Sequence, residues 1–221
     1  MTRYYPAFLN IESRRVVVIG GGNVAYRKVR ALLEAGTKIT VISPELSSDL
    51  MDLVAKEAIQ YVKDTFRESH IRGAWLVVAA TDDPLVQEQV YEACERERVF
   101  CNVVDVPERC SFIVPSLVRR GALNIAISTS GLGPGLSKAL RRELEALFPE
   151  SYAQFVECVG RLRKLVLAKC QDQGEKKRRL KILFDLDAAK WFIEGDRAAI
   201  ERWAQEIGGR EALEIVREYH G

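Results

Sequence analysis

The chain has 221 residues, of which 48% are hydrophobic and 29% are charged, and its formal net charge is +2. This balance is typical of a soluble globular protein and gives no general attraction to nucleic acid or to an anionic membrane. No apolar run approaches the roughly 18 to 20 residues that cross a bilayer, and the N-terminal segment lacks the apolar core of a signal peptide. We therefore expect a cytoplasmic protein that binds neither nucleic acid nor membranes.

The five cysteines are widely spaced, with no Cys-x-x-Cys pair, and there are only two histidines. The odd count and the spacing predict reduced thiols, most of them buried, instead of a disulfide framework. A cage of histidine and cysteine ligands is not expected either, so we predict no metal-binding residues.

Strands and helices alternate through the first half of the chain. An apolar, β-branched run at 15–19 predicts a buried parallel strand, the spacing of 23–35 predicts a helix, and 38–42 predicts a second strand. The alternation continues with a helix over 44–56, strands over 59–62 and 74–80, a helix over 83–98 and a strand over 100–104. This order predicts an α/β fold, a Rossmann-type doubly wound parallel sheet.

The pattern changes after residue 105. Extended runs at 112–119 and 123–129 flank Arg120-Gly121 and predict a hairpin. A glycine-rich loop at 130–135 follows, and helices are then expected over 136–147, 152–170, 175–184, 187–193, 196–207 and 211–219. We therefore predict a Rossmann domain at 1–113, a hairpin and helix at 114–149, and an all-helical C-terminal domain at 150–221.

The first predicted strand is followed by a dinucleotide-binding fingerprint. Gly20, Gly22 and Ala25 match Gly-x-Gly-x-x-Ala. Gly20 permits the tight turn, Gly22 lets a pyrophosphate approach the backbone, and Ala25 lets the helix pack close to the sheet. The start of the helix, at Asn23 and Val24, offers free N–H groups to the phosphates. These residues predict a dinucleotide site, and the alternative is a Rossmann scaffold that has lost its ligand.

The ends of later strands supply further candidates for cofactor binding. Ser43, Pro44 and Glu45 follow the second strand, where an acidic residue usually binds the ribose 2′-hydroxyl of NAD. No arginine stands next to them to hold a 2′-phosphate, which favours NAD over NADP. Thr81 and Asn102 lie near the ends of two later strands and are expected to face the same crevice.

Several short motifs, spread over the first two thirds of the chain, occur together in one family. They are Tyr-Tyr-Pro at 4–6, Gly-Gly-Gly-Asn-Val-Ala at 20–25, Arg-Lys at 27–28, Ala-Ala-Thr-Asp-Asp at 79–83, Asn-Val-Val-Asp at 102–105, Ser-Phe-Ile-Val-Pro at 111–115 and the loop at 128–135. In these motifs the chain resembles the precorrin-2 dehydrogenase and sirohydrochlorin ferrochelatase family, closely over 4–148 and loosely beyond. Because the chain ends at Gly221, we expect no methyltransferase module of the kind that multifunctional siroheme synthases carry.

The resemblance implies NAD-dependent oxidation of precorrin-2 to sirohydrochlorin in siroheme biosynthesis, with Asp105 as general base. It also implies a homodimer formed through the hairpin and helix at 114–149. The alternative for Asp105 is a turn aspartate before Pro107. One alternative function is a bifunctional dehydrogenase and ferrochelatase, with ferrous or cobaltous ion as co-substrate. Another is an NAD-sensing regulatory domain that oxidises nothing.

Precorrin-2 carries eight carboxylates, so the resemblance also implies a locally basic cleft, and arginine is suited to bidentate carboxylate binding. Each basic candidate has the alternative of a solvated surface charge. The candidate substrate ligands are Arg109, Arg119, Arg120, Lys138, Arg141 and Arg142, together with Ser128 and Thr129 of the glycine-rich loop.

Overall fold

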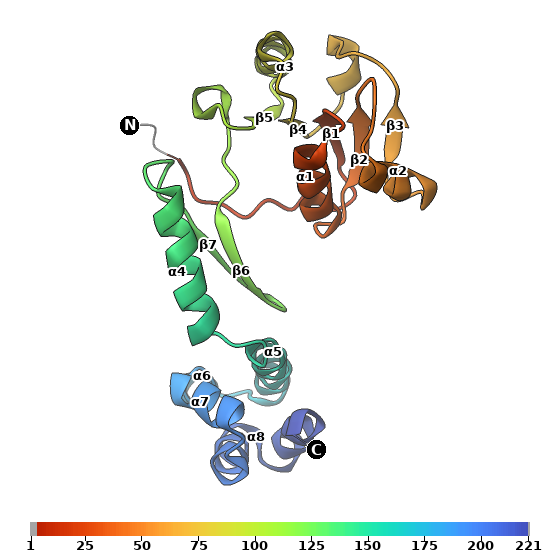
Figure 1. Cartoon of the computed structure of the whole chain (residues 1–221). Helices are drawn as coiled ribbons and strands as arrows, with labels where there is room; N and C mark the ends of the chain where they lie inside the picture. Colours follow the sequence, from red (N-terminus) through yellow and green to blue (C-terminus); the bar gives the residue numbers. More distant parts are fainter. Residues whose placement is uncertain (1–3, 221) are drawn as a thin grey trace. The chain divides into compact units, whose positions relative to one another are not determined.

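The computed structural model describes residues 4–220. The chain forms two compact units, Met1–Val114 and Pro115–Gly221. The first holds a five-stranded parallel sheet with its helices, and the second holds a two-stranded hairpin and the C-terminal helices (Figure 1). Across these described residues, no helix is both long and apolar enough to cross a membrane.

The sheet of the first unit is parallel throughout and has the strand order β3-β2-β1-β4-β5. The chain builds outward from β1 to β3 and then returns to the other side of β1, so the order reverses between β1 and β4. The predicted doubly wound sheet is therefore confirmed, and its reversal point is where such sheets bind ligands. The strands are β1 (Arg15–Ile19), β2 (Lys38–Ile42), β3 (Gln60–Val62), β4 (Leu76–Ala79) and β5 (Phe100–Val103).

Both faces of this sheet are covered, which explains the unbroken apolar run of β1. Val16 and Val18 belong to a buried cluster with Val29 of α1, whereas Val17 belongs to a second cluster with Val90 of α3. Alternate residues of a strand point to opposite faces, so a strand buried on both sides has no polar position. The connecting helices are α1 (Asn23–Leu33), α2 (Ser48–Ala55) and α3 (Pro84–Glu97), with 3-10 turns η1 (Glu68–Ile71) and η2 (Pro107–Arg109).

Helix α2 begins later than predicted, and residues 43–47 form a loop instead. The Ser47 N–H donates to the Gly21 carbonyl at 2.7 Å. The Tyr61 hydroxyl lies 3.1 Å from the Ser43 carbonyl and 3.3 Å from the Pro44 carbonyl. These partners are distant in sequence and hold the segment away from helical geometry. The predicted helix over 44–56 is therefore wrong at its start.

The second unit begins with the hairpin of β6 (Ser116–Arg120) and β7 (Leu123–Ile127), which pair antiparallel around Gly121. The predicted hairpin is confirmed, but its first strand begins at 116 and not at 112. Gly121 has a φ of 57°, a left-handed conformation that glycine adopts without strain. Helix α4 (Pro134–Leu147) follows the glycine-rich loop.

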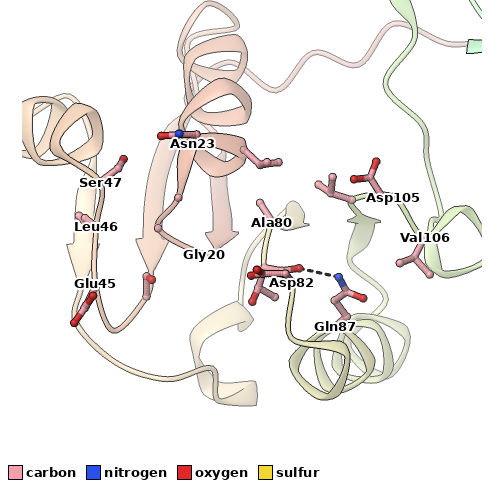
Figure 2. A pocket seen from close by; sticks show the side chains of 16 residues that line it. Gly20, Asn23, Glu45, Leu46, Ser47, Ala80, Asp82, Gln87, Asp105 and Val106 are labelled. Carbon is pink, nitrogen blue, oxygen red and sulfur yellow. Dashed lines mark hydrogen bonds between the residues drawn. The ribbon is translucent and has the colours of Figure 1, made fainter. Parts of the chain in front are cut away.

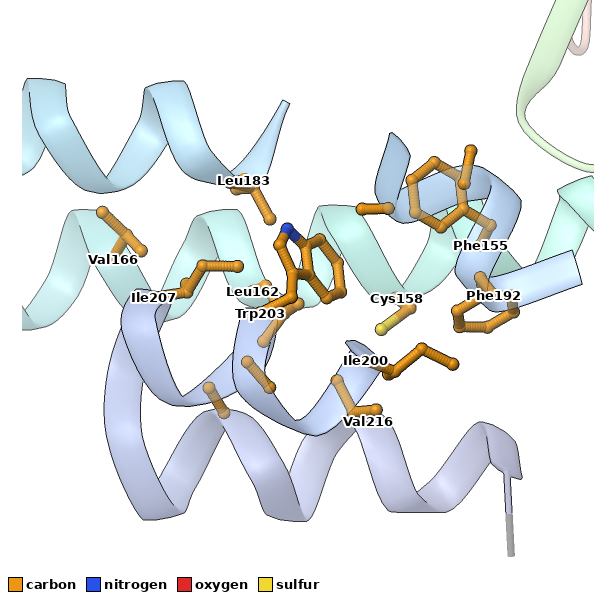
Figure 3. Close-up of a cluster of buried hydrophobic side chains, with 14 of the residues drawn as sticks. Phe155, Cys158, Leu162, Val166, Leu183, Phe192, Ile200, Trp203, Ile207 and Val216 are labelled. Atoms are coloured by element: carbon orange, nitrogen blue, oxygen red, sulfur yellow. The ribbon is translucent and has the colours of Figure 1, made fainter. Parts of the chain in front are cut away.

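The C-terminal helices share a core of their own (Figure 3). Phe155 and Leu162 of the first of these helices pack with Trp203 of the last, and the Trp203 indole N–H donates to the Ile182 carbonyl at 3.0 Å. The final helix is interrupted at residues 208–209, where both glycines leave helical geometry, as predicted. These helices are α5 (Tyr152–Lys169), α6 (Gln173–Leu183), α7 (Leu186–Glu194) and α8 (Arg197–His220).

Candidate functional site

A cavity of about 830 Å³ opens at the carboxyl ends of β1, β2, β4 and β5 (Figure 2). Its size is within the usual range for small-molecule sites, and it lies where the strand order reverses. The segments that follow these four strands form its wall. The lining residues are Gly20, Gly21, Gly22, Asn23, Val24, Ser43, Glu45, Leu46, Ser47, Ala80, Thr81, Asp82, Gln87, Val104, Asp105 and Val106.

The three glycines between β1 and α1 differ in the space around them. Gly20 has a φ of +118°, and a β-carbon there would lie 2.3 Å from the Ala80 carbonyl oxygen. A β-carbon on Gly21 would lie 1.8 Å from the Glu45 carbonyl oxygen. At Gly22 nothing lies within 4 Å of that position. Gly20 and Gly21 therefore serve the packing of the turn, whereas Gly22 leaves open space beside the backbone for a ligand.

Unsatisfied hydrogen-bond donors face this open space. Gly22 is the N-cap residue of α1 and has no side chain to cap the helix, and the first turn has no acidic residue. The N–H groups of this turn and the positive end of the helix dipole are therefore available to an anion. Ser47 also lines the cavity, and its buried hydroxyl has no hydrogen-bond partner among the described residues. The uncapped helix and the orphaned hydroxyl fit the phosphate and ribose oxygens of a dinucleotide.

The segment after β2 contributes two of its three predicted residues to the wall. Ser43 and Glu45 line the cavity, and the Glu45 side chain is exposed. Pro44 is exposed, is absent from the wall and uses its carbonyl as an acceptor for Tyr61. Pro44 therefore helps to shape the loop, and its contact with the cofactor stays a prediction.

The segment after β4 joins the wall through Thr81. The Gln87 amide donates to the Thr81 carbonyl at 2.7 Å, and this bond is the dashed line in Figure 2. Asp83 caps α3 by accepting from the N–H of Leu85 at 2.9 Å and of Val86 at 3.3 Å. The sequence did not predict Gln87 as a site residue, because it lies one turn inside α3, where it belongs to no strand-end or capping pattern.

Asp105 lies just beyond β5 and lines the cavity with an exposed side chain. Its φ is 64°, within a turn that the Val106 N–H closes by donating to the Val103 carbonyl at 3.2 Å. Aspartate is among the few residues that tolerate this left-handed conformation. The turn explains the left-handed backbone conformation of Asp105. Because Asp105 lines the cavity, its carboxylate is accessible to a ligand.

A lysine supplies positive charge near Asp105. Lys28, on α1, is half-buried, and its ammonium group forms no hydrogen bond or ion pair with another described residue. Burial is the main cause that lowers the pKa of Lys28, and Arg27 lowers it further. The negative charge of Asp105 opposes both effects, so the two side chains are close enough to interact electrostatically.

Asn102 does not face the cavity, contrary to the prediction. It is buried, and its amide donates to the Phe112 carbonyl at 3.1 Å and to the Cys110 sulfur at 3.5 Å. Asn102 therefore holds the returning chain against β5 and is removed from the cofactor-binding set.

The predicted substrate ligands lie in both units. Arg109, in η2 of the first unit, forms an ion pair with Glu88. Arg141 pairs with Glu145 at 2.6 Å, one turn along α4. Three further basic candidates of the second unit are exposed: Arg119 on β6, and Lys138 and Arg142 on α4.

The hydroxyl groups of the glycine-rich loop have partners within the loop and α4. The Ser128 hydroxyl accepts from the Ser130 N–H at 3.0 Å. The Thr129 hydroxyl accepts from the Gly133 N–H at 3.1 Å and lies 3.1 Å from the Ser137 hydroxyl. These bonds shape the loop, and the exposed Ser128 remains accessible from solvent. No group of three or more His, Cys, Asp or Glu side chains placed to hold a metal occurs within residues 4–220.

Arg120 is buried and bonded within its own unit, which contradicts its predicted role as a substrate ligand. Its guanidinium donates to the carbonyls of Phe148 at 2.6 Å, Arg119 at 2.7 Å and Glu145 at 3.2 Å. It also pairs with Glu150 at 3.1 Å. Arg120 thus joins the hairpin to the C-terminal end of α4, where unpaired carbonyls and the helix dipole favour a cation.

Replacing Arg120 with methionine is expected to lower the free energy of unfolding of the second unit by about 2 to 4 kcal/mol, because three carbonyls lose charge-assisted hydrogen bonds from a buried guanidinium. Chemical denaturation followed by tryptophan fluorescence measures the change. Lys138→Met removes the same charge from an exposed site on α4 and serves as the control. Equal stability of the two variants would show that the bonds of Arg120 contribute little.

Two family models match the chain. The family described as Putative NAD(P)-binding matches residues 7–116, and the family described as Sirohaem biosynthesis protein central matches residues 120–147. Among curated proteins, Siroheme synthase 3 of Aeromonas hydrophila subsp. hydrophila is 39% identical over 95% of this chain and 45% of its own length. Siroheme synthase of Neisseria meningitidis serogroup C is 40% identical over 79% of this chain and 36% of its own length. The chain thus spans less than half the length of these relatives.

A solved structure shares the fold over almost the whole chain. The protein named SirC, precorrin-2 dehydrogenase, has a TM-score of 0.73 and 24% sequence identity, and the match covers 98% of this chain and all of SirC. At this identity the likeness is one of fold. The cavity and the NAD(P)-binding family model together indicate a nicotinamide dinucleotide as the class of cofactor.

Proposed function

Because the chain is similar to siroheme synthases over most of its length and matches the sirohaem biosynthesis central family at residues 120–147, we propose that it oxidises precorrin-2 to sirohydrochlorin with NAD as the hydride acceptor. The observation that carries the proposal is that the uncapped N-terminus of α1 and Asp105 line the same cavity. The first suits a dinucleotide pyrophosphate, and the second suits proton removal from a bound substrate.

The oxidation removes a hydride and a proton from precorrin-2, and these become the new hydrogen of NADH and a proton released to the medium. Nicotinamide, when bound, accepts the hydride. Asp105 accepts the proton, and Lys28 supplies positive charge near it. The loop of Gly22 and the start of α1 hold the dinucleotide, so that positioning supplies much of the catalysis.

NAD is preferred over NADP in this proposal because of the segment after β2. Glu45 lines the wall there, and its carboxylate can accept a hydrogen bond from a ribose 2′-hydroxyl but repels a 2′-phosphate. Among the described residues that line the cavity, none is lysine or arginine. A 2′-phosphate would therefore meet negative charge without a compensating cation.

The deciding experiment is an anaerobic assay with precorrin-2 and NAD that follows NADH and sirohydrochlorin together. NADH formed in step with sirohydrochlorin supports the proposal. NAD binding without turnover of intact substrate rejects it and favours a nucleotide-sensing domain. Ferrous or cobaltous ion added in a second stage tests the chelatase alternative against an enzyme-free control.

We also propose that a second copy of the chain binds along α4. Three leucines on one face of this helix are exposed: Leu136 by 57%, Leu140 by 37% and Leu147 by 66%. Their spacing places them in one stripe, and a stripe of exposed leucine on an amphipathic helix is typical of a surface that a partner covers.

Leu140→Glu is expected to weaken dimer formation by about tenfold or more, because a carboxylate would be buried in an apolar interface. Sedimentation over a range of concentrations measures the monomer–dimer equilibrium. Ala146→Glu places the same group on the same helix away from the stripe and should leave the equilibrium unchanged. A dimer of undiminished strength in Leu140→Glu would exclude this face.

A further inference from the structure

Residues 110–112 return along β5, the edge strand of the sheet. The Ser111 N–H donates to the Cys101 carbonyl at 2.9 Å, and the Ser111 hydroxyl accepts from the Cys101 N–H at 2.7 Å. The returning segment therefore covers backbone groups that an edge strand leaves unpaired. It also brings residue 110 next to the turn that carries Asp105.

The Cys110 thiol bridges the two ends of that turn. Its sulfur lies 3.2 Å from the Val103 carbonyl oxygen and 3.3 Å from the Val106 carbonyl oxygen. Val103 and Val106 are the first and last residues of the turn, and Asp105 lies between them. One thiol thus contacts both carbonyls that frame Asp105.

Asn102 fixes the position of this thiol. Its amide has two N–H donors, and it directs them to the Cys110 sulfur at 3.5 Å and to the Phe112 carbonyl at 3.1 Å. Neither Asn102 nor Cys110 lines the cavity. They can therefore influence a ligand only through the turn.

The thiol must keep its proton in order to donate to the two carbonyls. Burial is the main cause that raises the pKa of Cys110, so the protonated form prevails at neutral pH. A thiol is a weak donor, but both acceptors belong to one short turn.

The backbone conformation of the Asp105 turn requires additional stabilising contacts. Asp105 has a φ of 64°, and non-glycine residues persist in this region only when their surroundings hold them there. The turn has a single backbone hydrogen bond of its own, from the Val106 N–H to the Val103 carbonyl. The contacts of Cys110 add a second constraint across the same four residues.

We propose that Cys110, oriented by Asn102, is a positioning residue that holds the turn of Asp105 and so aims the Asp105 carboxylate at the substrate. This inference rests on the proposed function, in which Asp105 is the base. The competing role for Cys110 is simple packing, since its side chain also contacts the apolar cluster beneath β5.

Three substitutions separate these roles. Cys110→Ser keeps a donor and loses apolar volume, Cys110→Val keeps apolar volume and loses the donor, and Cys110→Ala loses both. Positioning predicts that serine preserves kcat best, whereas packing predicts that valine does. Cys170→Val, at a buried cysteine of the second unit, is the control for the exchange of cysteine for valine and should leave kcat unchanged.

We expect Cys110→Val and Cys110→Ala to lower kcat for precorrin-2 by about tenfold, with the Kd for NAD within about twofold of the unsubstituted protein. Cys110→Ser should retain kcat within about threefold. In an Asp105→Asn background, Cys110→Val should lower kcat no further, because the group that Cys110 positions is gone. Unchanged kcat in Cys110→Val, or an equal loss in both backgrounds, would overturn the proposal.

Hydrogen exchange at the Val106 amide tests the turn without reference to catalysis. Loss of the thiol contacts should make this amide exchange about tenfold faster in Cys110→Val and leave it nearly unchanged in Cys110→Ser. An unchanged rate in Cys110→Val would overturn the positioning role even if catalysis were altered. If the unsubstituted protein did not oxidise precorrin-2, the proposed function would fail, and the exchange rate would still decide whether Cys110 holds the turn.

Discussion

Asp105→Asn is expected to lower kcat for precorrin-2 oxidation by about a hundred- to ten-thousand-fold, the usual contribution of a general base. Asparagine has nearly the shape of aspartate and tolerates the left-handed turn at φ 64°, so the change removes the proton acceptor and leaves the backbone in place. The cofactor contacts proposed for Gly22 and the start of α1 lie on a different segment. The Kd for NAD should therefore change by less than about threefold.

Anaerobic NADH formation measures kcat in this variant, and calorimetric titration measures the Kd for NAD. Glu108→Gln, three residues further along, removes the same charge from an exposed side chain outside the cavity wall and should behave as the unsubstituted protein. Near-normal turnover in Asp105→Asn would remove Asp105 from its role. A large loss of NAD affinity would instead make it a cofactor ligand.

Alanine at Gly22 and alanine at Gly21 should have opposite effects. At Gly22 a β-carbon meets no protein atom within 4 Å, so stability should be retained. The same methyl group would occupy space beside the start of α1, where a pyrophosphate approaches the backbone, and NAD affinity should fall by about tenfold or more. At Gly21 the β-carbon would lie 1.8 Å from the Glu45 carbonyl oxygen, so the first unit should lose about 1 to 3 kcal/mol or more of stability.

The two glycine variants serve as controls for each other. Circular dichroism during denaturation gives the free energy of unfolding, and titration with NAD gives the affinity. Retained NAD affinity in Gly22→Ala would mean that the dinucleotide does not bind over this turn. A Gly21→Ala protein as stable as the original would mean that the segment at 43–47 adjusts to admit a methyl group.

Local sequence patterns were sufficient for most of the first unit. The apolar run at 15–19 and the helical spacing after Gly22 predicted β1 and α1, since a strand buried on both faces and an amphipathic helix have distinct periodicities. The start of α2 was mispredicted because Tyr61 and Gly21 hold residues 43–47 as a loop. Bonds between segments distant in sequence leave no mark on local periodicity.

The same limit applied to the site. Asn102 stands at a strand end, where polar residues usually face the crevice, but its amide partners at 110 and 112 occupy both its donors. Arg120 stands at a hairpin turn, a typical place for a solvated charge, yet it binds the carbonyls at the end of α4. In both cases the prediction rested on the local sequence motif, whereas the hydrogen-bond partner of the side chain comes from a segment that only the tertiary fold brings near.

The placement of the tryptophans determines what intrinsic fluorescence can report. Trp203 is 4% exposed and donates to the Ile182 carbonyl, whereas Trp75, the one tryptophan of the first unit, is 47% exposed and lies under the Arg14 guanidinium. Unfolding moves Trp203 from an apolar interior into water but changes the surroundings of Trp75 much less. The emission maximum will therefore follow the unfolding of the second unit. To measure how much NAD stabilises the first unit, an experiment will need a probe that reports on its sheet.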